Sequence, residues 1–127
     1  DEVARFTATD VERLMGNAAI VRNRRKIEAT IRNADATIAL RASGGLAALV
    51  WGFRPDRTPA PRHPGEVPTS SPESVALSKA LRANGFGFVG PTTMFALMEA
   101  IGMVDTHLVG SHRRGTSGIW TEGGLRQ

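Results

Sequence analysis

Apolar residues recur along the chain at intervals of three and four positions, the spacing that gathers side chains on one face of an α-helix. A first helix is predicted to start near Asp10, behind a capping box formed by Thr9 and Glu12. Its apolar face would consist of Val11, Leu14, Met15 and Ala18. Gly16 and Asn17 are residue types typical of a helix end.

A second, longer helix is predicted from about Asn23 to about Arg41. The buried stripe expected for it is Ile27, Ile31, Ala34 and Ile38. The opposite, charged stripe is Arg25, Glu28, Arg32 and Asp35, with Asp35 a partner for Arg32 or Arg41. After Ser43-Gly44-Gly45, a short amphipathic helix is predicted from Leu46 to Phe53.

Residues 54–70 are rich in proline and show no period, so we expect a surface loop there. Ser71 followed by Pro72 predicts the start of another helix, which should end at Asn84-Gly85. Gly90-Pro91 opens a further helix that ends at Gly102 and carries one charged residue, Glu99, so it should be the most buried. Because no segment alternates with period two, the predicted fold class is all-α.

Charge and composition add one local feature to this picture. The 127 residues contain 16 Lys+Arg against 12 Asp+Glu, and Arg22, Arg24, Arg25 and Lys26 fall within five positions. A basic cluster at a predicted turn is a candidate phosphate contact. Cysteine is absent and no apolar run approaches the length of a membrane span, so we expect no membrane partner and a bacterial-type cytosolic location.

The two N-terminal helices and their turn can form a hairpin that binds DNA phosphates. Backbone N–H groups at the start of the second helix would face the phosphate, and small Ala18 and Ala19 would let it approach closely. Ile20 and Val21 would anchor the turn in the core. On local evidence, an ordinary helical corner with a solvated basic helix start is an equal alternative.

Two segments carry a family resemblance: NAAIVRNRRKIEATIRNA at residues 17–34 and SKALRANGFGFVGPTTMFALMEAIGMVDTHLVGS at residues 78–111. In this order and spacing they resemble the type I DNA-3-methyladenine glycosylases, which are helix-hairpin-helix repair enzymes. The resemblance implies an all-α helical bundle and covers the C-terminal two-thirds of the family fold. It implies a helical domain over 1–112, incomplete at its N-terminus, and a flexible tail over 113–127.

The resemblance also implies a function, the release of 3-methyladenine from alkylated double-stranded DNA in base excision repair. The family's base-reading residues lie in an N-terminal segment that this chain does not show, so we expect the chain alone to be inactive. What it would retain is the back wall of the base pocket, at Thr92, Phe95 and Ala96. No catalytic residue is assigned and no cofactor is required for the chemistry. A monomer is expected.

Family members hold a structural zinc with two Cys and two His, and one of these ligands matches His107. Four residues further on, where the family has Cys, this chain has Ser111, a poor zinc ligand. The resemblance therefore implies that zinc binding is impaired or absent in this chain.

Two other function classes stay open at this point. One is a non-catalytic helix-hairpin-helix module that binds the DNA backbone, and the other is a helical interaction domain without nucleic acid. For each pocket-wall residue taken singly, simple core packing is an alternative role.

Overall fold

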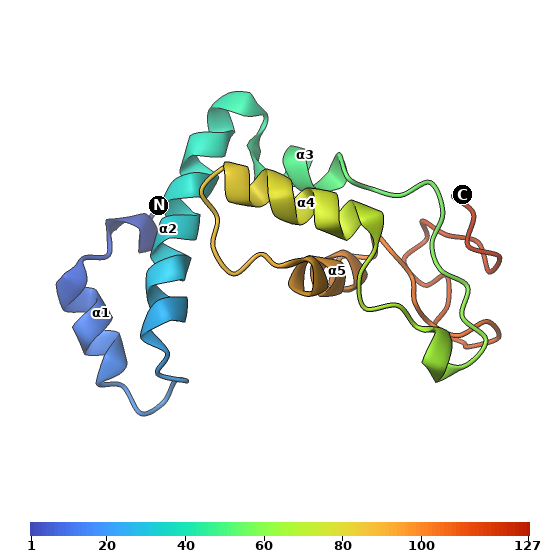
Figure 1. The fold of residues 1–127 in the computed structure, drawn as a ribbon, viewed down its shortest axis with the longest axis horizontal. Helices are drawn as coiled ribbons and strands as arrows, with labels where there is room; N and C mark the ends of the chain where they lie inside the picture. The colour runs from blue at the N-terminus through green and yellow to red at the C-terminus, as the bar shows by residue number, and fades with distance from the viewer. The chain divides into compact units, whose positions relative to one another are not determined.

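The computed structural model describes residues 1–127 and consists of helices joined by turns and loops (Figure 1). Its elements are η1 (Val3–Arg5), α1 (Ala8–Met15), α2 (Arg24–Leu40), η2 (Arg41–Ser43), α3 (Gly45–Trp51), η3 (Pro64–Glu66), α4 (Pro72–Ala83) and α5 (Pro91–Ala100). Strand-like pairing is limited to two isolated bridges, Arg57 with Leu125 and Trp120 with Arg126. The predicted all-α class is therefore confirmed. None of the helices has the length and apolar character needed to cross a membrane.

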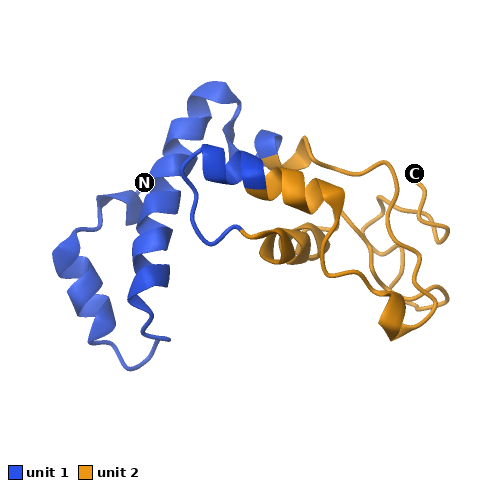
Figure 2. Cartoon of the chain, in the orientation of Figure 1, with its two compact units in different colours: residues 1–49, 79–89 blue, residues 50–78, 90–127 orange.

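The chain forms two compact units, which Figure 2 shows in different colours. Unit 1 comprises residues 1–49 and 79–89, and unit 2 comprises residues 50–78 and 90–127. The helical domain expected over 1–112 stays a prediction. The chain crosses between the units three times: inside α3, inside α4 and in the loop before α5.

Helix α1, in unit 1, starts two residues before the predicted position. Its capping residues are Thr7 and Asp10 instead of Thr9 and Glu12. The Asp10 carboxylate accepts hydrogen bonds from the Thr7 backbone N–H at 2.9 Å and from the Thr7 hydroxyl at 3.2 Å. A carboxylate three residues into a helix satisfies a backbone donor at the helix start, and Asp serves here as Glu does in the usual motif.

Helix α2 has the predicted extent, but the buried face differs from the predicted stripe. Ile27, Ile31, Ala34 and Ile38 are only half-buried. The fully buried residues are Ala29, Ala36 and Leu40. Two of them face glycines of the loop after α4. A Cβ added to Gly87 would lie 3.5 Å from the Ala29 Cβ, and a Cβ added to Gly85 would lie 3.9 Å from the Ala36 Cβ. The prediction followed the large apolar residues and therefore did not identify this face, where the close approach of a loop requires small side chains.

The caps of α4 match the sequence-based prediction. Ser71 Oγ accepts a hydrogen bond from the Ser74 N–H at 3.1 Å, and Ser74 Oγ accepts one from the Ser71 N–H at 2.9 Å. At the other end, Gly85 has φ 87°. Its N–H and that of Phe86 donate to Arg82 O and Leu81 O, the pattern of a Schellman cap. The sequence signals Ser-Pro and Asn-Gly therefore mark both ends of this helix correctly.

Unit 2 has its core around α5 and the chain that follows it. Met94, Phe95 and Met98 of α5 are buried, as are Leu77 of α4 and Met103. The other face of α5 is exposed at Thr92 and Ala96. The low charge of α5 predicted that this helix is the most buried one, and this prediction is right for one face of the helix only.

The C-terminal segment, residues 113–127, consists of packed turns where the sequence predicts a flexible tail. Trp120 is fully buried, and its indole N–H donates a hydrogen bond to Gly102 O at 3.2 Å. The Arg114 side chain is also buried, and it donates hydrogen bonds to carbonyl oxygens of Glu122 at 2.6 Å, His107 at 2.7 Å and Pro59 at 2.8 Å. The glycines supply tight turns here: Gly115, Gly118 and Gly124 all have positive φ.

Candidate nucleic-acid interface

The turn between α1 and α2, residues 16–23, is shaped by two asparagine side chains. Asn17 Oδ1 accepts a hydrogen bond from the Ala19 N–H at 2.9 Å, which folds the chain after α1. Asn23 Oδ1 accepts one from the Lys26 N–H at 3.2 Å and caps α2. Such short-range bonds are the reason asparagine favours turns and helix starts. The two helices and this turn form the predicted hairpin inside unit 1 (Figure 1).

Ile20 and Val21 were expected to anchor the turn in the core, and this prediction is wrong. Ile20 is 39% exposed and Val21 is 88% exposed. The turn is held by its asparagine hydrogen bonds and by an ion pair between the two helices, so it requires no apolar anchor. Ala18 and Ala19 are exposed as well, so the surface of the turn is open.

Several backbone N–H groups in and beside the turn donate no hydrogen bond within the chain. They belong to Ala18, Val21, Arg22, Arg24 and Arg25. Arg24 and Arg25 occupy the first two positions of α2, where the helix dipole adds a partial positive charge. Free donors at a helix start are the groups that bind phosphate in many proteins. The geometry of the turn therefore suits an anion.

The basic cluster divides into two kinds of residue. Arg24 forms an ion pair with Glu12 of α1 at 2.7 Å and a longer one with Glu28 at 3.9 Å. Arg22 and Lys26 are exposed and form no ion pair. Arg24 thus connects α1 to α2, while Arg22 and Lys26 remain available to a ligand. The sequence did not reveal this difference because the Glu12 contact depends on how the helices pack.

The other charged residues of α2 also differ from expectation. Asp35 forms no ion pair, although the helical spacing predicted Arg32 or Arg41 as its partner. Arg41 instead pairs with Asp1 at 2.8 Å. Arg25 and Arg32 have no ion-pair partner either. Asp35, Arg25 and Arg32 thus all lack an ion-pair partner, which leaves both arginines available to a ligand.

The three residues predicted as a pocket wall do not share one surface. Phe95 is 1% exposed and belongs to the core of unit 2. Thr92 and Ala96, four residues apart on α5, are exposed on the same face of the helix. Thr92 and Ala96 can contact a ligand directly, whereas Phe95 can only support the helix that presents them.

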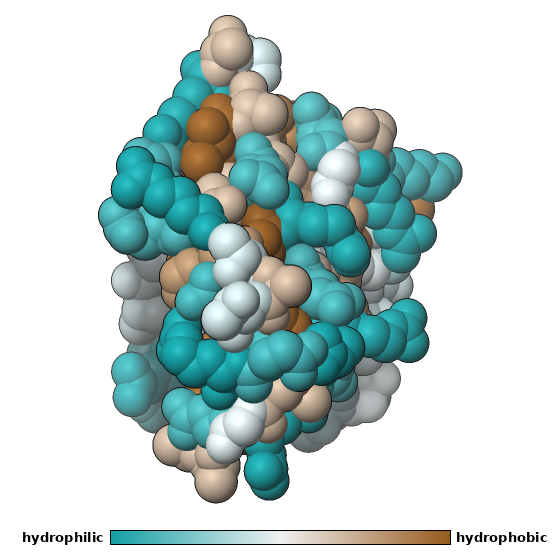
Figure 3. Space-filling model, turned by 90° about the vertical axis from the view of Figure 1, so that its left-hand side faces the viewer, coloured by the Kyte–Doolittle hydropathy of each residue, from teal (hydrophilic) through white to brown (hydrophobic).

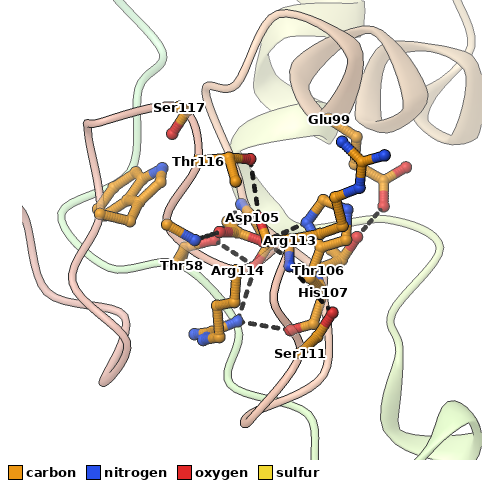
Figure 4. A network of polar contacts seen from close by, with 12 residues as sticks. Thr58, Glu99, Asp105, Thr106, His107, Ser111, Arg113, Arg114, Thr116 and Ser117 are labelled. Carbon is orange, nitrogen blue, oxygen red and sulfur yellow. Dashed lines mark hydrogen bonds and ion pairs between the residues drawn. The ribbon is translucent and has the colours of Figure 1, made fainter.

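Unit 2 also contains a polar network centred on Asp105, which sequence reasoning did not identify (Figure 4). Asp105 Oδ1 lies 2.8 Å from His107 Nδ1 and accepts a hydrogen bond from the His107 N–H at 3.0 Å. Asp105 Oδ2 accepts one from the Gly115 N–H at 2.7 Å. The Thr58 hydroxyl donates to Asp105 O at 2.9 Å. The network fastens residues 105–107 to the C-terminal segment and to the loop that follows α3.

Hydrogen bonds outweigh burial in setting the charge state of Asp105. Burial alone would raise the pKa of this carboxyl, but the bonds from the Gly115 N–H and from His107 hold the pKa below its ordinary value of 3.8. Asp105 is therefore ionised at neutral pH. Its carboxylate orients the His107 ring, whose other nitrogen is directed away from Asp105. A cavity of about 390 Å³, also lined by Glu99 and Ser117, lies beside this pair.

The residues present do not make up a zinc site. His107 offers one ring nitrogen to a metal, because Asp105 engages Nδ1, and Ser111 Oγ accepts a hydrogen bond from the Arg113 N–H at 3.3 Å. No group of three or more His, Cys, Asp or Glu side chains in the chain is arranged to hold a metal ion. A tetrahedral zinc site requires four ligands, with thiolate or imidazole preferred. His107 and Ser111 alone fall short of that set.

Comparison with known proteins gives the relationship of this chain. The sequence model of the methyladenine glycosylase family matches residues 1–114. The chain is 43% identical to DNA-3-methyladenine glycosylase 1 of Escherichia coli over 113 residues, which are 86% of this chain and 60% of that protein. It is 38% identical to DNA-3-methyladenine glycosylase of Haemophilus influenzae over 110 residues, which are 84% of this chain and 60% of that protein.

Solved structures agree with the sequence relationship. A crystal structure of 3-methyladenine DNA glycosylase I superposes with a TM-score of 0.83 at 39% identity, covering 88% of this chain and 63% of that one. A Staphylococcus aureus glycosylase, solved to explain 3-methyladenine recognition, gives a TM-score of 0.77 at 34% identity, with 84% and 58% covered. The chain spans about 60% of the length of these curated relatives. It belongs to the methyladenine glycosylase family.

Proposed function

We propose that this chain is the DNA-binding part of a glycosylase that releases 3-methyladenine from alkylated double-stranded DNA, acting as a monomer in the cytosol. The observation that carries the proposal is the hairpin start of α2, where free N–H groups lie beside the unpaired cations Arg22 and Lys26. The membership of the chain in the family supplies the reaction class.

In this proposal the hairpin holds the DNA backbone without reading its sequence. The N–H groups of Arg24 and Arg25 donate to a phosphate, and Arg22 and Lys26 add charge attraction. The small side chains of Ala18 and Ala19 leave the phosphate room to approach. Backbone contact of this kind keeps the duplex in place while a damaged base leaves the stack.

The chemistry demands little from the side chains of this chain. N3-methylation makes the adenine ring cationic, so it leaves readily, and the protein has mainly to select the base, extrude it and exclude wrong ones. The exposed face of α5 at Thr92 and Ala96 is the part of this chain that we assign to the base pocket. Lys26 lies in the hairpin and Asp35 on the solvated side of α2, and neither is assigned a catalytic role.

The alternative function is a module that binds DNA backbone without cleaving a glycosidic bond. The free hairpin donors support DNA binding in both cases, so a binding measurement alone does not distinguish the glycosylase from the binding module. Release of the damaged base distinguishes the two. An interaction domain without nucleic acid is a third class, and it predicts no salt-dependent DNA affinity.

The decisive experiment measures free 3-methyladenine released from methylated duplex DNA. We expect the 127-residue chain to bind the duplex but release no base. A chimera that joins to it the part of the Escherichia coli relative that this chain does not cover should release 3-methyladenine. A chimera that folds and binds DNA but leaves the methylated base in place would overturn the glycosylase proposal in favour of the binding module.

A further inference from the structure

The loop between α4 and α5 presents an aromatic side chain on the surface of unit 1. Phe88 is 50% exposed, while its neighbours Phe86 and Val89 are buried. Its φ is 56°, the one non-glycine residue of the chain in the left-handed region. That conformation is unfavourable for a bulky side chain and persists only where the surroundings impose it. The backbone that carries the exposed ring is therefore held in a defined conformation.

Asn33 of α2 provides that constraint. Its side-chain amide donates a hydrogen bond to Gly87 O at 3.0 Å and accepts one from the Gly87 N–H at 2.8 Å. Gly87 lies so close to α2 that a Cβ there would be 3.2 Å from Arg32 Nη2. The loop is thus fixed on α2 beside the Arg32 guanidinium, with Phe88 next along the chain.

The pocket at this contact is positively charged. It has a volume of about 310 Å³ and is lined by Arg25, Glu28, Arg32, Gly87 and Phe88. Arg25 and Arg32 form no ion pair, whereas the carboxylate of Glu28 is engaged with Arg24 at 3.9 Å. The two arginines are seven positions apart, so they lie two turns apart on one side of α2. Figure 3 shows one face of the chain, on which hydrophilic side chains surround smaller apolar areas.

We propose that this pocket binds one unstacked nucleotide of a DNA strand, with its phosphate held by Arg25 and Arg32 and its base stacked on Phe88. Guanidinium groups bind phosphate through charge-assisted hydrogen bonds. An exposed aromatic ring is the group on which unpaired bases stack, regardless of sequence. The inference rests on the proposed function, since it takes DNA as the ligand, and it adds a second contact next to the hairpin.

The test compares the affinity of the 127-residue chain for fluorescein-labelled single-stranded oligothymidine and for a blunt, undamaged duplex. Phe88→Leu should weaken single-strand binding about 5- to 100-fold, the loss expected when one base–aromatic stack is removed. It should leave duplex binding and both salt dependences unchanged. Phe88→Tyr, which keeps the ring, should bind like the original chain.

The double variant Arg25→Ala/Arg32→Ala should flatten the single-strand slope of log affinity against log salt by about 0.7, the value for the one phosphate that both arginines hold, and each single variant should flatten the slope by part of that amount. Arg82→Ala removes an exposed arginine of the same unit outside the pocket and serves as the matched control. Circular dichroism and melting of every variant establish that the fold is kept.

Two failures of this experiment have different meanings. If the original chain binds neither DNA, the proposed function falls and this inference falls with it. If duplex binding depends on Arg22 and Lys26 while the Phe88→Leu, Arg25→Ala and Arg32→Ala variants match Arg82→Ala on the single strand, the nucleotide pocket is refuted and the proposed function stands.

Discussion

At the start of α2, two arginines two positions apart have different surroundings. Arg24 reaches the Glu12 carboxylate on α1 at 2.7 Å, whereas Arg22 in the turn has no ionic partner. A carboxylate that pairs with an arginine offsets its positive charge and weakens its attraction for a phosphate. The number of basic residues in a cluster is therefore larger than the number that contact DNA. The sequence identified the cluster correctly but could not separate its members.

The first prediction concerns the free cations of the hairpin. Arg22→Ala and Lys26→Ala should each weaken DNA binding to a similar degree on all sequences. Each should also flatten the slope of log affinity against log salt by about 0.9, because one phosphate contact is lost from duplex DNA. Fluorescence anisotropy across a salt series measures both quantities.

Arg24→Ala is the comparison within the same cluster. It should change the salt slope less than Arg22→Ala, and it should lower stability by about 0.2–1 kcal/mol, the range for an exposed ion pair. If the salt slope flattens for Arg24→Ala but not for Arg22→Ala, then Arg24 contacts the phosphate and Arg22 does not, the opposite of what we predict.

The second prediction concerns pH and the cap of α1. Hydrogen bonds from the Thr7 backbone and from Arg13 lower the pKa of Asp10 below its ordinary value of 3.8. Because the folded pKa is the lower one, the stabilisation is complete above the ordinary value and is lost as pH falls through the folded pKa. The Tm difference between the original chain and Asp10→Ala should therefore shrink in acid. A difference that stays constant with pH would mean that the Asp10 charge plays no part.

At the scale of elements, the sequence predicted helix ends better than helix faces. Ser71, Asn23 and Gly85 mark ends through local hydrogen bonds and positive φ, which depend on neighbouring residues only. Which face is buried depends on partners far along the chain. The loop at Gly85 and Gly87 covers Ala29 and Ala36, and nothing near those alanines in the sequence indicates it.

The third prediction tests this correction of the α2 face. Leu40 is 6% exposed, so Leu40→Ala should lower the free energy of unfolding by about 2–5 kcal/mol through an internal cavity. Ile31 was predicted as buried but is only half-buried, so Ile31→Ala should cost less. Urea denaturation of both variants gives the two values. Equal costs would show that Ile31 is buried as deeply as Leu40, as the sequence pattern predicted.

For the molecule as a whole, composition was a poor guide to the C-terminal segment. Its Gly, Ser and Arg content predicted flexibility, yet Trp120 and Arg114 are buried there and hydrogen-bonded to distant backbone. A guanidinium carries several donors in a fixed plane, so one arginine can satisfy carbonyls from separate loops. Such a residue cannot be told from a surface arginine by sequence. The candidate polar network around Asp105 was missed for the same reason.

The fourth prediction concerns Arg114. Arg114→Ala leaves the carbonyl oxygens of Glu122, His107 and Pro59 without their donor, and an unsatisfied buried group costs about 1–3 kcal/mol. We expect a clear drop in Tm, and faster hydrogen exchange within residues 113–127. Arg114→Lys should recover little of this, since one ammonium cannot reach all three loops. Arg113→Ala, on an exposed neighbour, is the matched control.

The last prediction concerns zinc. At the two zinc-ligand positions of the family that we match in this chain stand His107, oriented by Asp105, and Ser111, whose hydroxyl stays protonated at neutral pH. We therefore predict no stoichiometric zinc in the 127-residue chain after dialysis, measured by elemental analysis, and no change of Tm on adding EDTA. Ser111→Cys supplies a thiolate but still leaves two ligands of four, so it should not create a tight site. One firmly held zinc per chain, in either protein, would contradict this prediction and show that other side chains complete a site.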